Sequence, residues 1–223
     1  MTLLFMHITK TAGGSLKEAM RKSDADVVFH YRDEDGWNPQ FKYERKPAVL
    51  FGHYIFGAHE RLEVPPQYGC FLREPVARSI SHYYHLKNND LGPVGTRLRT
   101  YDSLESYLLE GQHWEFDNFL CRVISGVGNK PKFGNVGFNV YAQARRNLIE
   151  YFQFIGLFER MTESLERLRK VVPSLDIDLP MVNRGSYTKE IAPDALRLVQ
   201  ALNNYDKLLY EDAAALFSAG DHN

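Results

Sequence analysis

Short apolar runs alternate with longer amphipathic segments along most of the chain. Five runs have the length and residues of buried strands, and each is bounded by polar residues or by Pro and Gly. The predicted strands are Leu3 to Ile8, Asp26 to Tyr31, Ala48 to Gly52, Tyr68 to Arg73 and Phe152 to Phe158.

Apolar residues recur at helical spacing between these runs and after the last of them. The predicted helices cover Leu16 to Met20, Val76 to Lys87, Leu104 to Glu110, Phe116 to Ile124, Val140 to Tyr151, Met161 to Val172 and the region from Pro193 to Leu216. Three stretches without strong periodicity are predicted as loops: Arg32 to Lys46, Asn88 to Thr100 and Val127 to Phe138. The alternation of strands and helices predicts an α/β three-layer sandwich. Its central, mostly parallel sheet has helices on both faces, and ligands bind beyond the carboxyl ends of the strands.

Composition limits the kind of protein without defining its chemistry. With 223 residues, 44% of them hydrophobic, the chain can bury one sizeable core, so we expect one domain over residues 1–223. A formal net charge of -1 gives no global reason for binding to nucleic acid or a membrane surface, so any anion site must be local. Two cysteines, Cys70 and Cys121, and the lack of a leader or long apolar segment suit a cytoplasmic protein. The oligomeric state stays open.

The first candidate site follows the first predicted strand, in the segment from His7 to Ser15. A strand that runs into Lys10-Thr11-Ala12-Gly13-Gly14-Ser15 and then a helix supplies backbone N–H groups, a helix N-terminus and a cation, which together form an anion cradle. Lys10 would reach the anion, and the Thr11 and Ser15 hydroxyls could donate to its oxygens. The alternative is a tight turn whose glycines permit positive φ. The segment is not a Walker A motif, because Lys10 precedes both glycines.

A second candidate site follows the fourth predicted strand. Arg73 ends that strand, Pro75 can begin a helix, and Ser81 lies nearly two turns further on. A guanidinium and a hydroxyl that meet one anion suit a terminal phosphate monoester, which presents more free oxygens than a diester. The alternative is an Arg paired with a surface carboxylate and a Ser on a helix face.

A histidine stands at the end of the third predicted strand. His53 follows the apolar run from Ala48 to Gly52 and would face the same crevice as the two anion sites. A neutral imidazole can accept a proton near pH 7, so His53 is a candidate general base. The alternative is a capping or core histidine. His59, His82 and His85 are weaker candidates.

These segments resemble the PAPS-dependent sulfotransferases, in particular the carbohydrate branch that includes heparan sulfate 2-O-sulfotransferases. Lys10, Thr11, Gly13 and Ser15 match the family's 5′-phosphosulfate loop, although Thr9 replaces its usual Pro and Gly14 a frequent Thr. The segment from Arg73 to Tyr84 is similar to the family's 3′-phosphate element R-D-P-x-x-R-x-x-S-x-Y-Y, with Glu74 in place of Asp. Weaker similarity extends to Asp117, Asn118, Arg122, Phe154 to Glu159, Asn183 to Lys189 and Asn203 to Tyr210.

The resemblance implies a P-loop-like fold and sulfuryl transfer from PAPS to a hydroxyl, with 3′,5′-ADP as the product. His53 would be the base and Lys10 would stabilise the leaving group. The donor-binding residues would be Lys10, Thr11, Ala12, Gly13, Gly14, Ser15, Arg73 and Ser81. No metal is expected, because no H-E-x-x-H or C-x-x-C spacing occurs.

Two other functions remain open. An ATP-dependent P-loop phosphotransferase would share the strand, loop and helix but would need Mg²⁺ and acidic ligands. A non-catalytic nucleotide- or glycan-binding domain would keep the cradle without turnover. The expected acceptor is a glycan or a small molecule, and several cations either contact an acidic sugar or are simply solvated: Arg97, Arg99, Lys130, Lys132, Arg145 and Arg146.

Overall fold

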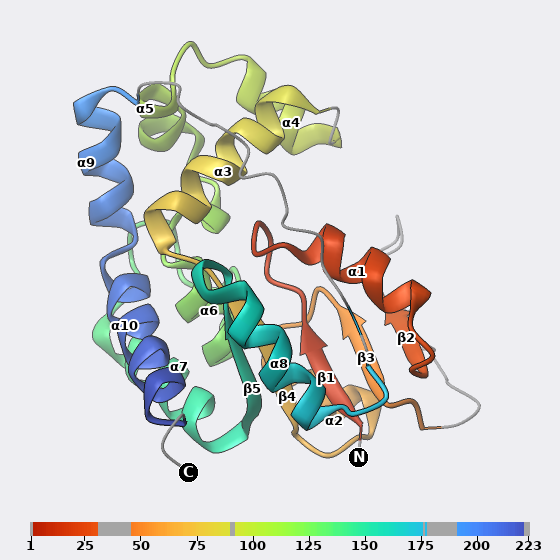
Figure 1. Ribbon diagram of the computed structural model, residues 1–223. Coiled ribbons are helices and arrows are strands. Elements are labelled where there is room, and N and C mark those ends of the chain that lie inside the picture. Colours follow the sequence, from red (N-terminus) through yellow and green to blue (C-terminus); the bar gives the residue numbers. More distant parts are fainter. Residues whose placement is uncertain (1, 31–45, 90–91, 176, 178–190, 221–223) are drawn as a thin grey trace.

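The chain forms a three-layer α/β structure, seen in a computed structural model that describes residues 2–30, 46–89, 92–175, 177 and 191–220 (Figure 1). One five-stranded sheet lies at the centre, in the order β2-β3-β1-β4-β5, and every strand pair in it is parallel. The strands are β1 (Leu3–Met6), β2 (Val27–His30), β3 (Val49–Gly52), β4 (Tyr68–Leu72) and β5 (Phe152–Leu157). The predicted fold class is confirmed, and the observed strands lie within the predicted ones.

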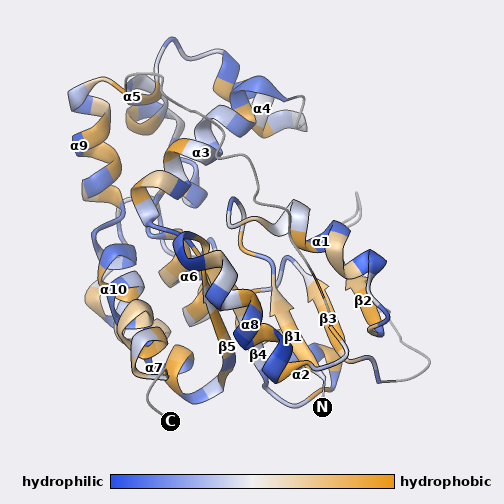
Figure 2. Ribbon diagram, in the orientation of Figure 1, coloured by the Kyte–Doolittle hydropathy of each residue, from blue (hydrophilic) through white to orange (hydrophobic). Residues whose placement is uncertain are grey.

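The sheet is covered on both faces, which explains why its strands are nearly continuous apolar runs. Alternate side chains of the strands point to opposite faces. Leu3, Phe5 and Phe51 pack with the helices α1 (Gly13–Lys22) and α8 (Met161–Val171). Leu4 and Met6 pack with the opposite layer, formed by α2 (Ala58–Leu62), α6 (Phe119–Ser125), α7 (Phe138–Tyr151) and α10 (Asn204–Ala219). Figure 2 shows the contrast between hydrophobic strands and helices of mixed polarity.

A third apolar cluster lies beyond the carboxyl ends of the strands. It joins α3 (Pro75–Asn88), α4 (Gly92–Arg99), α5 (Leu104–Ser106), the π-helical turn η1 (Tyr107–Gly111) and α9 (Pro193–Leu202). The prediction of a loop from Asn88 to Thr100 is therefore wrong. The segment carries few apolar residues, and Leu98 becomes buried only through contact with the neighbouring helices.

Buried polar contacts hold the amino end of α6 in place. Asp206 accepts hydrogen bonds from the backbone N–H groups of Leu120 and Cys121, each at 2.8 Å. Asn118 Oδ1 accepts from the N–H of Asp206 at 3.1 Å in return, and the buried Asp117 and Arg122 form an ion pair. The acidic and amide residues of these two segments, 117–122 and 203–210, therefore join α6 to α10.

Two short 3₁₀ turns complete the described structure: η2 (Trp114–Phe116) and η3 (Phe158–Arg160). Cys70 and Cys121 are both free and buried, as expected for a chain without a disulfide framework. Among the described residues, no helix combines the length and apolar character needed to cross a bilayer. The predicted loop Arg32 to Lys46, apart from its last residue, and the segment Asn183 to Lys189 lie outside the described residues.

Candidate functional site

The three predicted site segments meet because their strands are neighbours in the sheet. β1 is flanked by β3 and β4, and Met6 lies in register with Gly52 on one side and Cys70 on the other. All three strands run in the same direction, so the segments that follow them leave the sheet at one edge. The loop after β1 therefore lies between His53 and Arg73.

The loop between β1 and α1 has a strained backbone. Lys10 and Ala12 both adopt positive φ, 69° and 70°, which costs free energy for residues with a side chain. The side chain of Arg73 supports this conformation, since its Nη1 donates to the Lys10 carbonyl at 3.2 Å. The guanidinium of Arg73 also lies over the ring of Phe158, 4.5 Å from its centroid. Strain held by neighbouring contacts is typical of a ligand-binding loop.

The glycines of this loop do not serve positive φ, as the alternative interpretation had assumed. Gly13 is needed because the His7 imidazole occupies the space of a side chain: a Cβ at Gly13 would lie 1.5 Å from His7 Nε2. Gly14 is exposed, and a Cβ there would meet nothing within 4 Å. The first N–H groups of α1 therefore open onto a surface without side-chain obstruction or a side-chain cap.

The two hydroxyls of the loop differ in what they can offer an anion. Thr11 is buried, and its hydroxyl donates to the Ile8 carbonyl at 2.8 Å, so this hydroxyl would have to leave that bond to donate to a phosphate. Thr11 can still offer its backbone N–H. Ser15 is half-buried and its hydroxyl has no hydrogen-bond partner among the described residues, which leaves it available to a ligand.

Lys10 and Arg73 form a positively charged pair. Burial, and then the charge of Arg73, lower the pKa of Lys10. Burial and the charge of Lys10 likewise lower the pKa of His85 on α3. Ser81 lies one helical turn before His85, so the face of α3 that carries Ser81 is also turned toward Lys10. An anion bound between the loop and α3 would offset the positive charges of Lys10 and Arg73.

His53 is held in a defined tautomer. Its Nδ1 lies 2.9 Å from the carbonyl oxygen of His7, which can only accept, so Nδ1 carries the proton and Nε2 is the basic nitrogen of the neutral ring. The two imidazoles stack with centroids 4.4 Å apart. Desolvation by the surrounding protein lowers the pKa of His53, although the His7 carbonyl and the Glu115 carboxylate oppose this. Burial and the neighbouring His53 lower the pKa of His7 to about 3, so His7 is uncharged at neutral pH.

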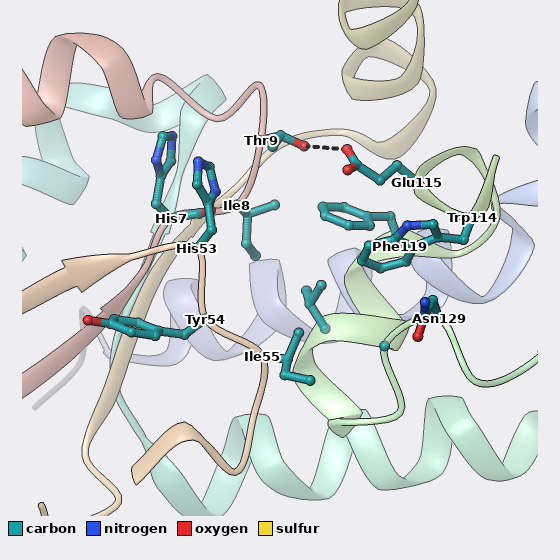
Figure 3. A pocket seen from close by; sticks show the side chains of 12 residues that line it. His7, Ile8, Thr9, His53, Tyr54, Ile55, Trp114, Glu115, Phe119 and Asn129 are labelled. Atoms are coloured by element: carbon teal, nitrogen blue, oxygen red, sulfur yellow. Dashed lines mark hydrogen bonds between the residues drawn. The ribbon is translucent and has the colours of Figure 1, made fainter. Parts of the chain in front are cut away.

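A cavity of about 370 Å³ opens beside His53 (Figure 3). His7, Thr9 and His53 form one side, and Trp114, Glu115 and Phe119 the other. Gly128 and Asn129, from the predicted loop after α6, complete the lining together with Ile8, Tyr54, Ile55 and Val123.

Sequence reasoning missed His7 and Glu115. His7 was part of the recognised loop, yet its role became visible only when Gly13 and His53 were placed beside it. Glu115 lies between two helical segments, and no local pattern distinguishes it from a surface carboxylate.

Three potential metal ligands lie close to this cavity. The ligand atoms of His82, His113 and Glu115 lie within 4.8 Å of one another, and His82 Nε2 is 2.9 Å from Glu115 Oε2. Spacing along the sequence gave no sign of this group, because His82 comes from α3 and the other two from the segment around η2. The expected absence of a metal stays a prediction that a chelator tests.

A strained loop after β1, an arginine directly after the adjacent strand β4 and a histidine directly after β3 lie at one edge of the sheet, and a comparison with known families follows from this arrangement. The sequence model of the Sulfotransferase family matches residues 1–211, so the chain belongs to that family.

Curated relatives refine the comparison. The chain is 28% identical to the heparan sulfate 2-O-sulfotransferase of Caenorhabditis elegans over 138 residues, which cover 58% of this chain and 42% of the relative. It is 26% identical to heparan sulfate 2-O-sulfotransferase 1 of Mus musculus over 161 residues, covering 66% of this chain and 42% of the relative. The match thus spans about two-fifths of the length of these relatives.

Proposed function

We propose that this protein transfers a sulfuryl group from PAPS to a hydroxyl of a carbohydrate. The donor lies across the loop from Lys10 to Ser15, with its 5′-phosphosulfate at the N-terminus of α1 and its 3′-phosphate between Arg73 and Ser81. The observation that carries the proposal is the meeting of Lys10, Arg73 and His53 at one edge of the sheet, where β3, β1 and β4 end side by side.

His53 and Lys10 divide the chemistry between them. His53 Nε2 removes the proton of the acceptor hydroxyl while the hydroxyl oxygen forms a bond to sulfur. The bond between sulfur and the bridging oxygen breaks, and its electron pair stays on the 5′-phosphate. Lys10 stabilises the negative charge that develops on that oxygen. The products are a sulfate ester and 3′,5′-ADP.

Radiolabelled sulfate transfer tests this function directly. The protein is incubated with labelled PAPS and a panel of glycans and small alcohols, with and without EDTA. We expect label in a carbohydrate acceptor and no effect of the chelator. Transfer from ATP that requires Mg²⁺ would favour the phosphotransferase instead. Binding of 3′,5′-ADP without any transfer would favour a non-catalytic nucleotide-binding domain.

Replacement of Arg73 with alanine should weaken binding of 3′,5′-ADP by about 10- to 100-fold, the value of a charge-assisted contact. Binding of 5′-AMP should fall much less, because it lacks the 3′-phosphate. Some loss for both nucleotides is expected, since Arg73 also supports the Lys10 carbonyl. The ratio of the two dissociation constants, measured by calorimetry, is therefore the relevant quantity. An unchanged ratio would contradict a contact between Arg73 and the 3′-phosphate.

The dependence of kcat/KM on pH should report the titration of His53. The base acts in its neutral form, so activity is lost as pH falls through its pKa. Because desolvation lowers that pKa, the midpoint should lie below the ordinary value of 6.5, with a plateau at neutral pH. Initial rates between about pH 5 and 8 measure this limb, which spans the usual range of histidine titration. A midpoint above 6.5 would contradict the assignment.

A further inference from the structure

One charged side chain in the cavity has no part in the proposed reaction. Glu115 reaches the cavity from η2, with its side chain 22% exposed. Both of its contacts use Oε2, which lies 2.9 Å from His82 Nε2 and accepts a long hydrogen bond from the Thr9 hydroxyl at 3.5 Å. Oε1 has no hydrogen-bond partner among the described residues, so it can accept from a ligand.

Arg78 holds the backbone of Glu115 in place without lining the cavity. Arg78 is fully buried on the far side: its Nη2 donates to the Glu115 carbonyl at 2.6 Å and its guanidinium lies over the Phe119 ring. Arg78 therefore holds the wall of the cavity and does not line it.

No lysine or arginine lines the cavity in the part of the chain that the structure describes (Figure 3). None of the cations considered for an acidic acceptor is among the described lining residues. Arg145 and Arg146 line a separate hollow on α7, and Arg145 lies 3.2 Å from Asp212. Lys10 and Lys17 both act on His7 electrostatically, and neither lines the cavity; the proposed donor uses Lys10 and Arg73. A carboxylated sugar in this cavity would thus meet the carboxylate of Glu115 and no lysine or arginine among the described lining residues.

The rest of the lining suits an uncharged sugar ring. Trp114 and Phe119 lie with ring centroids 5.2 Å apart and, with Ile55 and Val123, present apolar surface. Sugar rings combine C–H faces with hydroxyl donors, so they match apolar walls that hold one carboxylate acceptor.

The following inference rests on the proposed function. We propose that this cavity binds a neutral sugar, one hydroxyl of which donates to Glu115 Oε1. Glu115 excludes acceptors that carry a carboxylate at this position. Glu115 is a specificity-determining residue, while proton transfer belongs to His53. This acceptor class differs from a polyanionic glycan such as the heparan sulfate in the names of the relatives.

A matched pair of acceptors tests the proposal on the unmodified protein. Methyl β-glucoside and methyl β-glucuronide differ only at C6, where a CH₂OH group replaces a carboxylate. We expect kcat/KM with the glucoside to exceed that with the glucuronide by about 10- to 100-fold, as for an unpaired charge in a partly desolvated site. Equal rates, or faster transfer to the glucuronide, would overturn the proposal and leave the proposed function intact.

The variant Glu115→Gln should narrow this preference to within about threefold, by slowing transfer to the glucoside and accelerating transfer to the glucuronide. Glu110→Gln is the matched control, since it removes the same charge from an exposed position outside the cavity. It should preserve the preference. An equal loss with both acceptors in Glu115→Gln, at unchanged affinity for 3′,5′-ADP, would assign Glu115 to catalysis or structure and overturn the proposal.

Binding measurements separate this proposal from the proposed function. Calorimetry of both methyl glycosides, in the presence of 3′,5′-ADP, needs no turnover. Absence of sulfate transfer to every acceptor would refute the proposed function. Tighter binding of the glucoside would still support the cavity's preference, and equal or tighter binding of the glucuronide would refute it.

Discussion

Replacement of Lys10 with alanine is expected to lower kcat for sulfate transfer by about 10²- to 10³-fold, the typical loss when one group that stabilises transition-state charge is removed. Lys10 lies in a loop whose conformation places it beside Arg73, and no other lysine occurs between residues 7 and 15. The charge it stabilises grows only as the bond to sulfur breaks. The loss should therefore fall on kcat more than on the affinity for 3′,5′-ADP, and steady-state rates with PAPS measure both.

Lys22→Ala provides the control for Lys10. Lys22 is at the other end of α1, where its exposed side chain pairs with Glu18 on the same helix. Such a surface pair contributes little, so this variant should retain full activity. A Lys10→Ala protein with normal kcat would contradict a role in leaving-group stabilisation. So would a variant that is partly unfolded at the assay temperature, since loss of folded protein would then explain the lower rate.

Replacement of His53 with alanine is expected to lower kcat by about 10²- to 10⁴-fold, the range for loss of a general base. His53 Nε2 is the basic nitrogen of the neutral ring because Nδ1 donates to the carbonyl of His7. The variant should bind 3′,5′-ADP normally and should lack the acidic limb of the pH profile. Stopped assays with labelled PAPS across the pH range measure both properties.

His59→Asn separates this role from a general effect of losing an imidazole. His59 was a weaker candidate for the base, and the structure places it on α2, where its Nδ1 lies 2.8 Å from the hydroxyl of Tyr68 at the start of β4. That is the opposite end of the strand from Arg73, so this variant should keep its turnover. Wild-type turnover in His53→Ala would refute the assignment of the base.

The strands and the order of the candidate sites were predictable because both depend on local sequence. A run such as Tyr68 to Leu72 is apolar, short and followed by a Pro, which leaves few alternatives to a buried strand. The short helix α4 was missed because its stability comes from contacts of Leu98 with other helices, and not from a periodic pattern. A cytoplasmic location and a single domain over the whole chain stay predictions.

By itself, the sequence predicted an anion cradle after β1 and placed His53 and Arg73 directly after two further strands. Only the tertiary structure decided how these groups lie relative to one another. The sheet order β3-β1-β4 sets the three segments side by side, positive φ falls on Lys10 and Ala12 and not on the glycines, and the backbone of His7 fixes the tautomer of His53. Glu115 enters the same cavity from a distant turn. Local patterns specify which residues form an element, whereas contacts between distant segments depend on packing, which no short stretch of sequence encodes.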